Sequence, residues 1–172
     1  MSKRKKRLTT MVLAGALLIA LTMMGSVPAS AQTEDKDLSL ILVADTVRGN
    51  LNLLEGDMGA NLCVQRSRFS LGEHIVWRIR VYDPQLGTAM DDVALDSVQV
   101  LFDDGQLFET RYAGHGAEGA KDFFWTTSWV IPEDYPTGSL GHQIIAKAKD
   151  GRTGEFVPFN VSYSLLTIVL PQ

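Results

Sequence analysis

The sequence predicts an all-β fold, an antiparallel β-sandwich of seven to nine strands. Three observations support this prediction. Strand-length segments alternate apolar and polar residues, turn-forming residues recur roughly every 8 to 12 positions, and after residue 31 no helical periodicity lasts more than about two turns. With 172 residues, 45% of them apolar, the chain has room for one domain of ordinary size.

The first 31 residues have the three-part pattern of a secretory signal peptide. The stretch from Lys3 to Arg7 is entirely basic, the uncharged apolar run from Met11 to Met24 follows, and Ala29-Ser30-Ala31 predicts cleavage before Gln32. The alternative is an uncleaved anchor helix, but the apolar run is short for a membrane span, which needs about 20 residues. We therefore expect a secreted or periplasmic protein, exported through a Sec-type route, with no stable membrane anchor after cleavage.

Removal of this segment changes the charge balance of the chain. The whole chain has 16 Lys and Arg against 20 Asp and Glu, a net charge of −4. The segment contains five of the basic residues and no acid, so the mature part has a net charge of −9. An acidic body of this size repels phosphate backbones, which argues against nucleic-acid binding.

Residues 32–60 are expected to be a polar lead-in before the sandwich, which we place at residues 61–172. The lead-in contains one candidate strand, the apolar run from Leu38 to Ala44. Glycine, asparagine and aspartate are dense between Arg48 and Ala60, which predicts a loop.

The clearest strand of the chain is His74 to Tyr82, because Ile75, Trp77, Ile79 and Val81 alternate with polar residues. The same alternation puts His74 on the outward face. Further segments are expected as strands or turns in chain order: a strand at Ser97 to Phe102, a turn at Asp103-Asp104-Gly105, a returning strand at Gln106 to Tyr112, a glycine-rich loop at Ala113 to Ala120, a strand at Phe123 to Ile131 and a corner at Pro132 to Gly138.

The last third of the chain predicts three more strands. In the segment from Leu140 to Ala148, Leu140, His142 and Ile144 begin the apolar face. A turn at Asp150 to Gly154 leads to a strand at Glu155 to Val161, and Leu165 to Leu170 is the final strand. Pro158 lacks a backbone N–H, so we expect it at a sheet edge or bulge.

Two stretches carry a resemblance to a known architecture. The run from Leu140 to Val161 (LGHQIIAKAKDGRTGEFVPFNV) resembles the final hairpin of bacterial immunoglobulin-like modules, and Gly72 to Gly87 followed by Val98 to Phe102 is similar to their early strands. The chain has no cysteine pair between sheets, and Leu140 stands where antibody-type domains have a tyrosine. The resemblance implies an immunoglobulin-like β-sandwich at the level of architecture.

His142 is the first residue to inspect for chemistry, because the alternation places its imidazole among apolar neighbours. A buried histidine can be a base or a metal ligand, but a core histidine bonded to backbone explains the pattern as well. Only two other histidines exist, His74 and His115, and the sequence brings no two of the three together.

Cys63 is the single cysteine, so no internal disulfide is possible, and a small buried strand residue is its expected role. Met58, Met90, Cys63 and the histidines are possible copper ligands, yet no two of them are close neighbours in the sequence. We expect no metal site and no cofactor.

The acidic pairs predict turns rather than catalysis. Asp91-Asp92, Asp103-Asp104 and Glu133-Asp134 are adjacent residues, whereas a hydrolase needs two carboxylates held across a cleft. No Gly-x-Ser-x-Gly motif supports a serine nucleophile, so we expect no catalytic residues.

The aromatic residues offer a second kind of site. The side chains of Phe123, Phe124, Trp125, Trp129 and Tyr135 could form a surface that stacks on a sugar or a peptide. Trp125 and Trp129 share a face with Phe123 and are expected in the core, whereas Phe124 is expected outside. A patch around Phe124 would favour a binding surface.

These observations favour an exported, non-catalytic binding or accessory module that docks onto another envelope or extracellular protein. An exposed edge near Pro158, or the run from Leu38 to Ala44, could bind a partner by strand addition. The alternative is a periplasmic metal-handling or electron-transfer accessory protein that uses His142 with Cys63 or a methionine. A third hypothesis, an enzyme of unrecognised kind, remains because fold does not determine function.

Overall fold

The computed structural model describes residues 39–52, 63–161 and 165–171. The chain divides into two units after Asp35, and every described residue belongs to the second unit. The predicted signal peptide lies outside the described residues. Among the described residues there is no helix long and apolar enough to cross a membrane.

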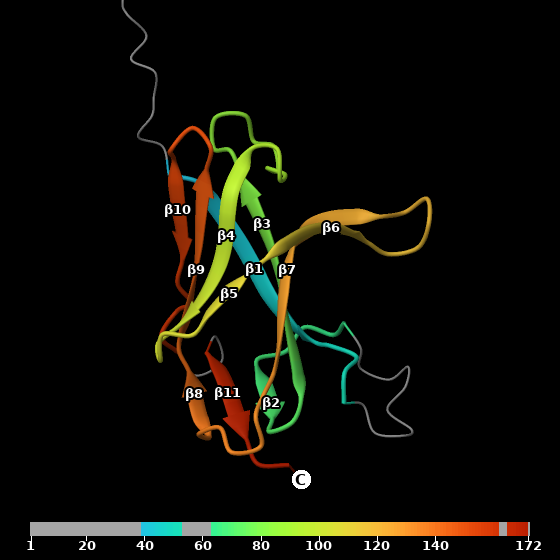
Figure 1. Cartoon of the computed structure of the whole chain (residues 1–172), viewed down its shortest axis with the longest axis vertical. Coiled ribbons are helices and arrows are strands. Elements are labelled where there is room, and N and C mark those ends of the chain that lie inside the picture. The colour runs from blue at the N-terminus through green and yellow to red at the C-terminus, as the bar shows by residue number, and fades with distance from the viewer. Residues whose placement is uncertain (1–38, 53–62, 162–164, 172) are drawn as a thin grey trace, which may run out of the picture. The chain divides into compact units, whose positions relative to one another are not determined.

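The described chain is all-β, as predicted, and its sheets are built from antiparallel pairs with one parallel exception, β2 with β11 (Figure 1). Eleven strands are present in the described ranges: β1 (Ile41–Arg48), β2 (Arg68–Ser70), β3 (His74–Tyr82), β4 (Leu95–Phe102), β5 (Leu107–Glu109), β6 (Arg111–His115), β7 (Asp122–Val130), β8 (Gly138–Leu140), β9 (His142–Ala148), β10 (Thr153–Phe156) and β11 (Leu166–Val169). They form three sheets, in the orders β1-β3-β7-β6, β10-β9-β4-β5 and β2-β11-β8.

The two four-stranded sheets share one hydrophobic core. The alternating residues predicted to face inward on β3 are each 0% exposed, and Val98, Val100 and Phe102 on β4 are at most 2% exposed. Trp77 of β3 contacts Phe102 of β4 with ring centroids 5.5 Å apart, so aromatic packing joins the two sheets. Each fully buried side chain of this size contributes about 1.5–3 kcal/mol to folding.

The count of seven to nine strands was too low, because predicted strands divide. The segment from Leu140 to Ala148 passes from β8 in the three-stranded sheet to β9 in a four-stranded sheet, and the change falls at Gly141. A Cβ on Gly141 would lie 1.8 Å from a carboxylate oxygen of Asp103, so a larger residue at this junction would require the exposed Asp103 side chain to move. Its apolar alternation is nevertheless as predicted, from Leu140 (5% exposed) to Ala148 (1%).

The segment after the Asp103–Gly105 turn also divides. Gly105 has the expected positive φ (89°), and Leu107–Glu109 pairs back with β4 as predicted. The chain then changes sheet at Thr110, and Arg111–His115 forms β6, which pairs with β7. The expected loop at Ala113 to Ala120 is therefore partly a strand, because its first three residues complete a hairpin with β7.

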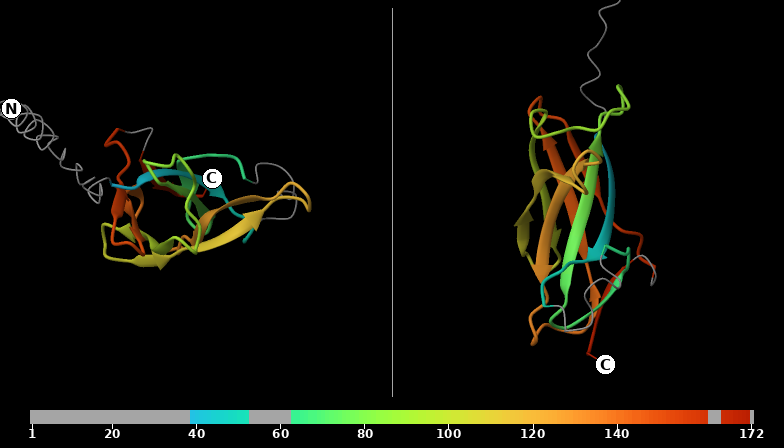
Figure 2. Two further views of the ribbon diagram at one scale, coloured as in Figure 1. Left: turned by 90° about the horizontal axis from the view of Figure 1, so that it is seen from above. Right: turned by 90° about the vertical axis from the view of Figure 1, so that its right-hand side faces the viewer.

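The β6–β7 hairpin leaves the body of its sheet. β7 pairs with β3 only from Trp125 to Val130, while Asp122 to Phe124 pair with β6 alone. Two perpendicular views agree that the hairpin extends beyond the facing sheets (Figure 1; Figure 2, left).

Strand β1 lies at the edge of its sheet, next to β10 of the other sheet. It pairs with β3 along its whole length, so this part of the expected lead-in belongs to the folded unit. At one end the backbone N–H of Leu40 donates to the Thr153 carbonyl (2.9 Å). Gly154 permits this approach, because a Cβ there would lie 2.5 Å from the Leu40 carbonyl oxygen.

An ion pair also connects the two sheets at this end. Arg152, just before β10, forms an ion pair with Asp83, just after β3 (2.8 Å), and both side chains are mostly buried. The hydrogen bond from Arg152 is the main reason that the pKa of Asp83 falls to about 2. From this joint β1 runs diagonally away from β10 (Figure 1).

Candidate functional site

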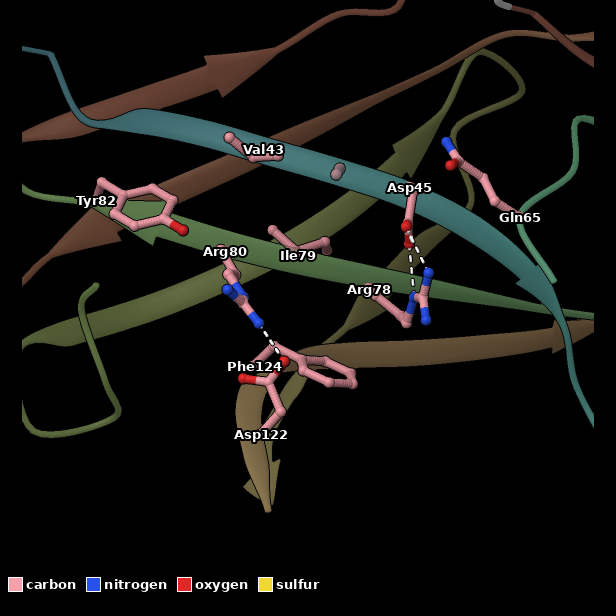
Figure 3. A pocket seen from close by; sticks show the side chains of 10 residues that line it. Val43, Asp45, Gln65, Arg78, Ile79, Arg80, Tyr82, Asp122 and Phe124 are labelled. Carbon is pink, nitrogen blue, oxygen red and sulfur yellow. Dashed lines mark hydrogen bonds and ion pairs between the residues drawn. The ribbon is translucent and has the colours of Figure 1, made fainter. Parts of the chain in front are cut away.

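The outer face of the β1-β3-β7-β6 sheet carries a hollow of about 470 Å³, which we call the outer hollow. Strands β1 and β3 form its base, and Asp122 and Phe124 reach it from the β6–β7 hairpin (Figure 3). Val43 (56% exposed) and Tyr82 lie along the same face.

Two ion pairs occupy the outer hollow. The Arg78 guanidinium binds the Asp45 carboxylate in a bidentate manner, with Nε to Oδ1 at 2.7 Å, and Arg80 pairs with Asp122 (Figure 3). The hydrogen bond to Asp45 raises the pKa of Arg78. Each charge already has a partner, so this arrangement suits recognition of a partner's shape and charge better than proton transfer.

Aromatic rings stiffen the hairpin that overhangs the outer hollow. His115 of β6 stacks on Phe124 with ring centroids 4.2 Å apart and an interplanar angle of 12°. Gly114 makes room for Phe123, since a Cβ there would lie 2.9 Å from the Phe123 ring. Tyr112 also contacts that ring, at 5.9 Å.

The expectation for these aromatics was partly wrong. Phe123 is 51% exposed, whereas Phe124 is half-buried against His115. The reason is that β7 joins β3 only from Trp125 onward. Phe123 lies on the same face of β7 as Trp125, but it lies in the part of the hairpin that extends beyond the core. Trp125 is buried as predicted, and Trp129 packs against the core beside Tyr135.

A second hollow, of about 660 Å³, opens where β1 and β10 diverge, and we call it the seam groove. Residues 44–46 of β1 and 65–67 line one side, and residues 155–159 line the other. Its buried lining residues include Trp77 of β3, Leu166 of β11 and His142 of β9, and the rings of Trp77 and His142 have centroids 6.0 Å apart. Ala44, Asp45 and Gln65 line both hollows, so the two meet around the edge of β1.

Three side chains of the seam groove carry a buried nitrogen that has no hydrogen-bond partner in the described part of the chain. These atoms are Arg66 Nε, Trp77 Nε1 and His142 Nδ1. The buried indole of Trp125, in contrast, has a hydrogen-bond partner, because its Nε1 donates to the Met90 carbonyl (3.1 Å). Buried polar atoms are normally paired, so three exceptions in one groove call for an explanation.

His142 is inward-facing and 8% exposed, as predicted. Burial lowers its pKa, although the backbone of Leu140 and the Asp103 carboxylate oppose this effect. The imidazole is therefore neutral near pH 7, and a neutral ring nitrogen can donate or accept a hydrogen bond depending on its tautomer.

His74 was expected on the outward face of its strand and is buried instead. The register is as predicted, but His74 is only 6% exposed because the segment after β1 covers it. Its Nδ1 accepts a hydrogen bond from the Leu51 N–H (3.2 Å), and Gly49 approaches so closely that a Cβ would lie 2.0 Å from that nitrogen. Burial lowers the pKa of His74.

Cys63 is not the buried strand residue that we expected. It is exposed and lies in a turn with φ of 59°, so its backbone conformation removes it from the core. Met90 packs in the core, and Met58 lies outside the described residues. Within the ranges that the structure describes, no three His, Cys, Asp or Glu side chains gather as metal ligands.

The acidic pairs serve the turns in which they lie. One carboxylate oxygen of Asp91 accepts hydrogen bonds from the backbone of Val93 and Ala94. Asp104 accepts hydrogen bonds from the Gln106 backbone and the Tyr135 hydroxyl, and burial together with Asp104 raises the pKa of Tyr135 to about 12. These contacts support the turn interpretation of both segments.

Comparison with known proteins gives no assignment, since no protein-family model and no curated protein matches the sequence. The structure defines the class of protein as all-β, with a charged outer hollow and a seam groove rich in hydrogen-bond donors. Sequence reasoning singled out His142 and the possible partner-binding edges at Ala44 and Pro158, and all three residues line the seam groove. It missed Arg66 and the indole nitrogen of Trp77, because local patterns carry no signal for an unpaired atom in a groove built from distant segments.

Proposed function

We propose that this chain is an exported, non-catalytic module of immunoglobulin-like β-sandwich architecture that docks onto another envelope or extracellular protein. Two facing four-stranded sheets over one core support the sandwich architecture. The basic, apolar and small-residue pattern of residues 1–31 supports export and cleavage before Gln32.

The β6–β7 hairpin is the observation that carries the docking proposal. It extends beyond its sheet, the rings of His115 and Phe124 stack within it, and Phe123 is 51% exposed. Exposed aromatic side chains on rigid elements are typical anchors of protein interfaces. The adjacent outer hollow supplies apolar and charged groups on the same face, including Val43 and the Arg80–Asp122 pair.

Charge favours a partner with a basic surface. The expected mature chain has a net charge of −9, and opposite charge on a partner accelerates association. Within the outer hollow the charges are already paired, so the contact there would depend on shape and on apolar burial.

Site-specific photo-crosslinking in the cells that produce the protein tests this proposal. A benzoyl-phenylalanine replaces Phe123, and a matched control replaces Leu107 on β5, which is equally exposed (52% against 51%) but belongs to the other sheet. We expect one dominant protein adduct at position 123 and none at position 107. No adduct at position 123, or equal adducts at both positions, would overturn the proposal.

A further inference from the structure

The edge of β1 beside the seam groove is bonded at its ends and open in the middle. Leu40 donates its N–H to Thr153, and the carbonyls of Thr46 and Arg48 accept from Arg66 (3.0 Å) and Cys63 (3.3 Å). Backbone groups alternate along an edge strand, so Leu42 and Ala44 also direct their N–H and C=O away from β3. Neither residue has a backbone partner on that side within the described chain.

The facing edge of β10 has the same character. The carbonyl of Arg152 accepts the Ala148 N–H on the β9 side, while that of Thr153 accepts the Leu40 N–H on the β1 side. By the same alternation Glu155 directs its backbone groups toward β1, and it too has no backbone partner there among the described residues. Of these residues, Ala44 and Glu155 line the seam groove, whereas Leu42 lies against Gly154. The two edges therefore present the free backbone groups of Ala44 and Glu155 to the groove.

The interior of the groove is selective for a particular kind of side chain. An indole Nε1–H and a guanidinium Nε–H can only donate a hydrogen bond, and both nitrogens are buried without a partner in Trp77 and Arg66. Leaving such donors unpaired in a protein interior carries a free-energy cost. A ligand that supplies an oxygen acceptor at this depth recovers that cost.

We propose that the seam groove binds a short extended polypeptide segment of the docking partner, whose backbone pairs with Ala44 and Glu155 and whose inserted side chain presents an oxygen acceptor to Trp77 and Arg66. This inference rests on the proposed docking function and names the part of the partner that is recognised. The acceptor is the oxygen of a carboxylate or of a side-chain amide, which share this chemistry. Val157 (61% exposed) and Phe159 (80%) on the rim are free to cover apolar neighbours of the inserted residue.

The free backbone groups favour a polypeptide over a compact small molecule. Strand addition uses main-chain hydrogen bonds for affinity and alternate side chains for specificity. Because Ala44, Asp45 and Gln65 line both hollows, alternate side chains of an added strand would enter the seam groove and the outer hollow in turn. The open part of the β1 edge is short, so the paired segment is only a few residues long.

Titration of the ¹⁵N-labelled full chain with three model peptides tests this inference. The probes are acetylated, amidated Val-Thr-X-Thr-Val peptides in which X is Glu, Gln or Leu. We expect the Glu and Gln peptides to shift the Trp77 indole resonance at millimolar concentration and the Leu peptide to leave it unchanged. The Trp125 indole is the internal control, because its N–H is already bonded to Met90.

Two variants remove one donor each. Trp77→Phe keeps an aromatic ring in the core, and Arg66→Lys keeps a cation near Glu73 but has no Nε–H donor. Because Trp77→Phe removes the indole reporter, binding to both variants is followed from the backbone amide resonance of Ala44. We expect each variant to weaken binding of the Glu peptide about tenfold, with the Trp125 resonance unchanged as evidence of intact folding.

Each outcome decides the inference. Equal Trp77 shifts with all three peptides, no shift with any peptide, or unchanged affinity in a folded Arg66→Lys variant would overturn it. Photo-crosslinking at position 123 of the wild-type chain reports docking separately. If crosslinking there persists while the groove binds no peptide, only this inference fails, whereas loss of crosslinking would count against the proposed function.

Discussion

Replacing Gly154 with alanine is expected to open the joint between β1 and β10. The added Cβ would lie 2.5 Å from the Leu40 carbonyl oxygen and 2.6 Å from Cδ1 of Leu42, so the two strands must separate. Separation strains a packed region, which typically costs about 1–3 kcal/mol. It also weakens the Leu40–Thr153 hydrogen bond, which typically contributes about 1 kcal/mol. Because a shift of the strand relieves the clash, we expect a net loss of about 2 kcal/mol, or roughly 4–8 °C in Tm.

Urea unfolding followed by tryptophan fluorescence measures this loss, and hydrogen exchange of the Leu40 amide locates it. Gly87→Ala is a useful control, because its Cβ would meet open space while its φ of 64° disfavours alanine. We expect the control to cost about 1 kcal/mol and to leave exchange at Leu40 unchanged. A Gly154→Ala variant that loses less than about 0.5 kcal/mol and keeps Leu40 protected would refute the steric reasoning.

Two further predictions concern the N-terminus after signal-peptide cleavage and the dependence of stability on pH. Protein recovered from the envelope or medium should begin at Gln32 by intact mass, and recovery of the full-length mass would contradict the signal-peptide interpretation. Burial lowers the pKa values of His74 and His142 below 6.5, so the unfolded chain binds more protons just below pH 6.5 and stability should fall on acidification from there. A His142→Leu variant should have a flatter dependence of the urea midpoint between pH 7.5 and 5, and identical slopes would argue against this origin.

The strands that could be predicted are those whose residues alternate without interruption. The bounds of β3, His74 to Tyr82, coincide with the prediction, and the Asp103–Gly105 turn forms where its Asp-Gly pair favours positive φ. In such segments the buried face is determined locally, because each strand must direct one row of apolar residues into the core.

Features that depend on distant contacts could not be predicted in this way. The break at Gly141 leaves the apolar alternation intact, and the close approach of the Asp103 side chain to Gly141 comes from a residue almost forty positions earlier. The burial of His74 comes from Gly49 and Leu51, which precede it by more than twenty residues. The same is true of the seam groove, because Arg66, Trp77 and His142 come from three separate segments and line one groove only in the folded chain.

The pairing of distant strands also has a consequence for the time that the chain needs to fold. Strand β4 pairs with β9 more than forty positions later, and β2 pairs in parallel with β11, close to the other end of the described chain. Closing these long loops costs conformational entropy before the paired strands gain any stabilising contact. All-β proteins with such non-local pairing fold in milliseconds to seconds. The three-stranded sheet in particular cannot be completed until β11, the last strand of the described chain, is available to lie between β2 and β8.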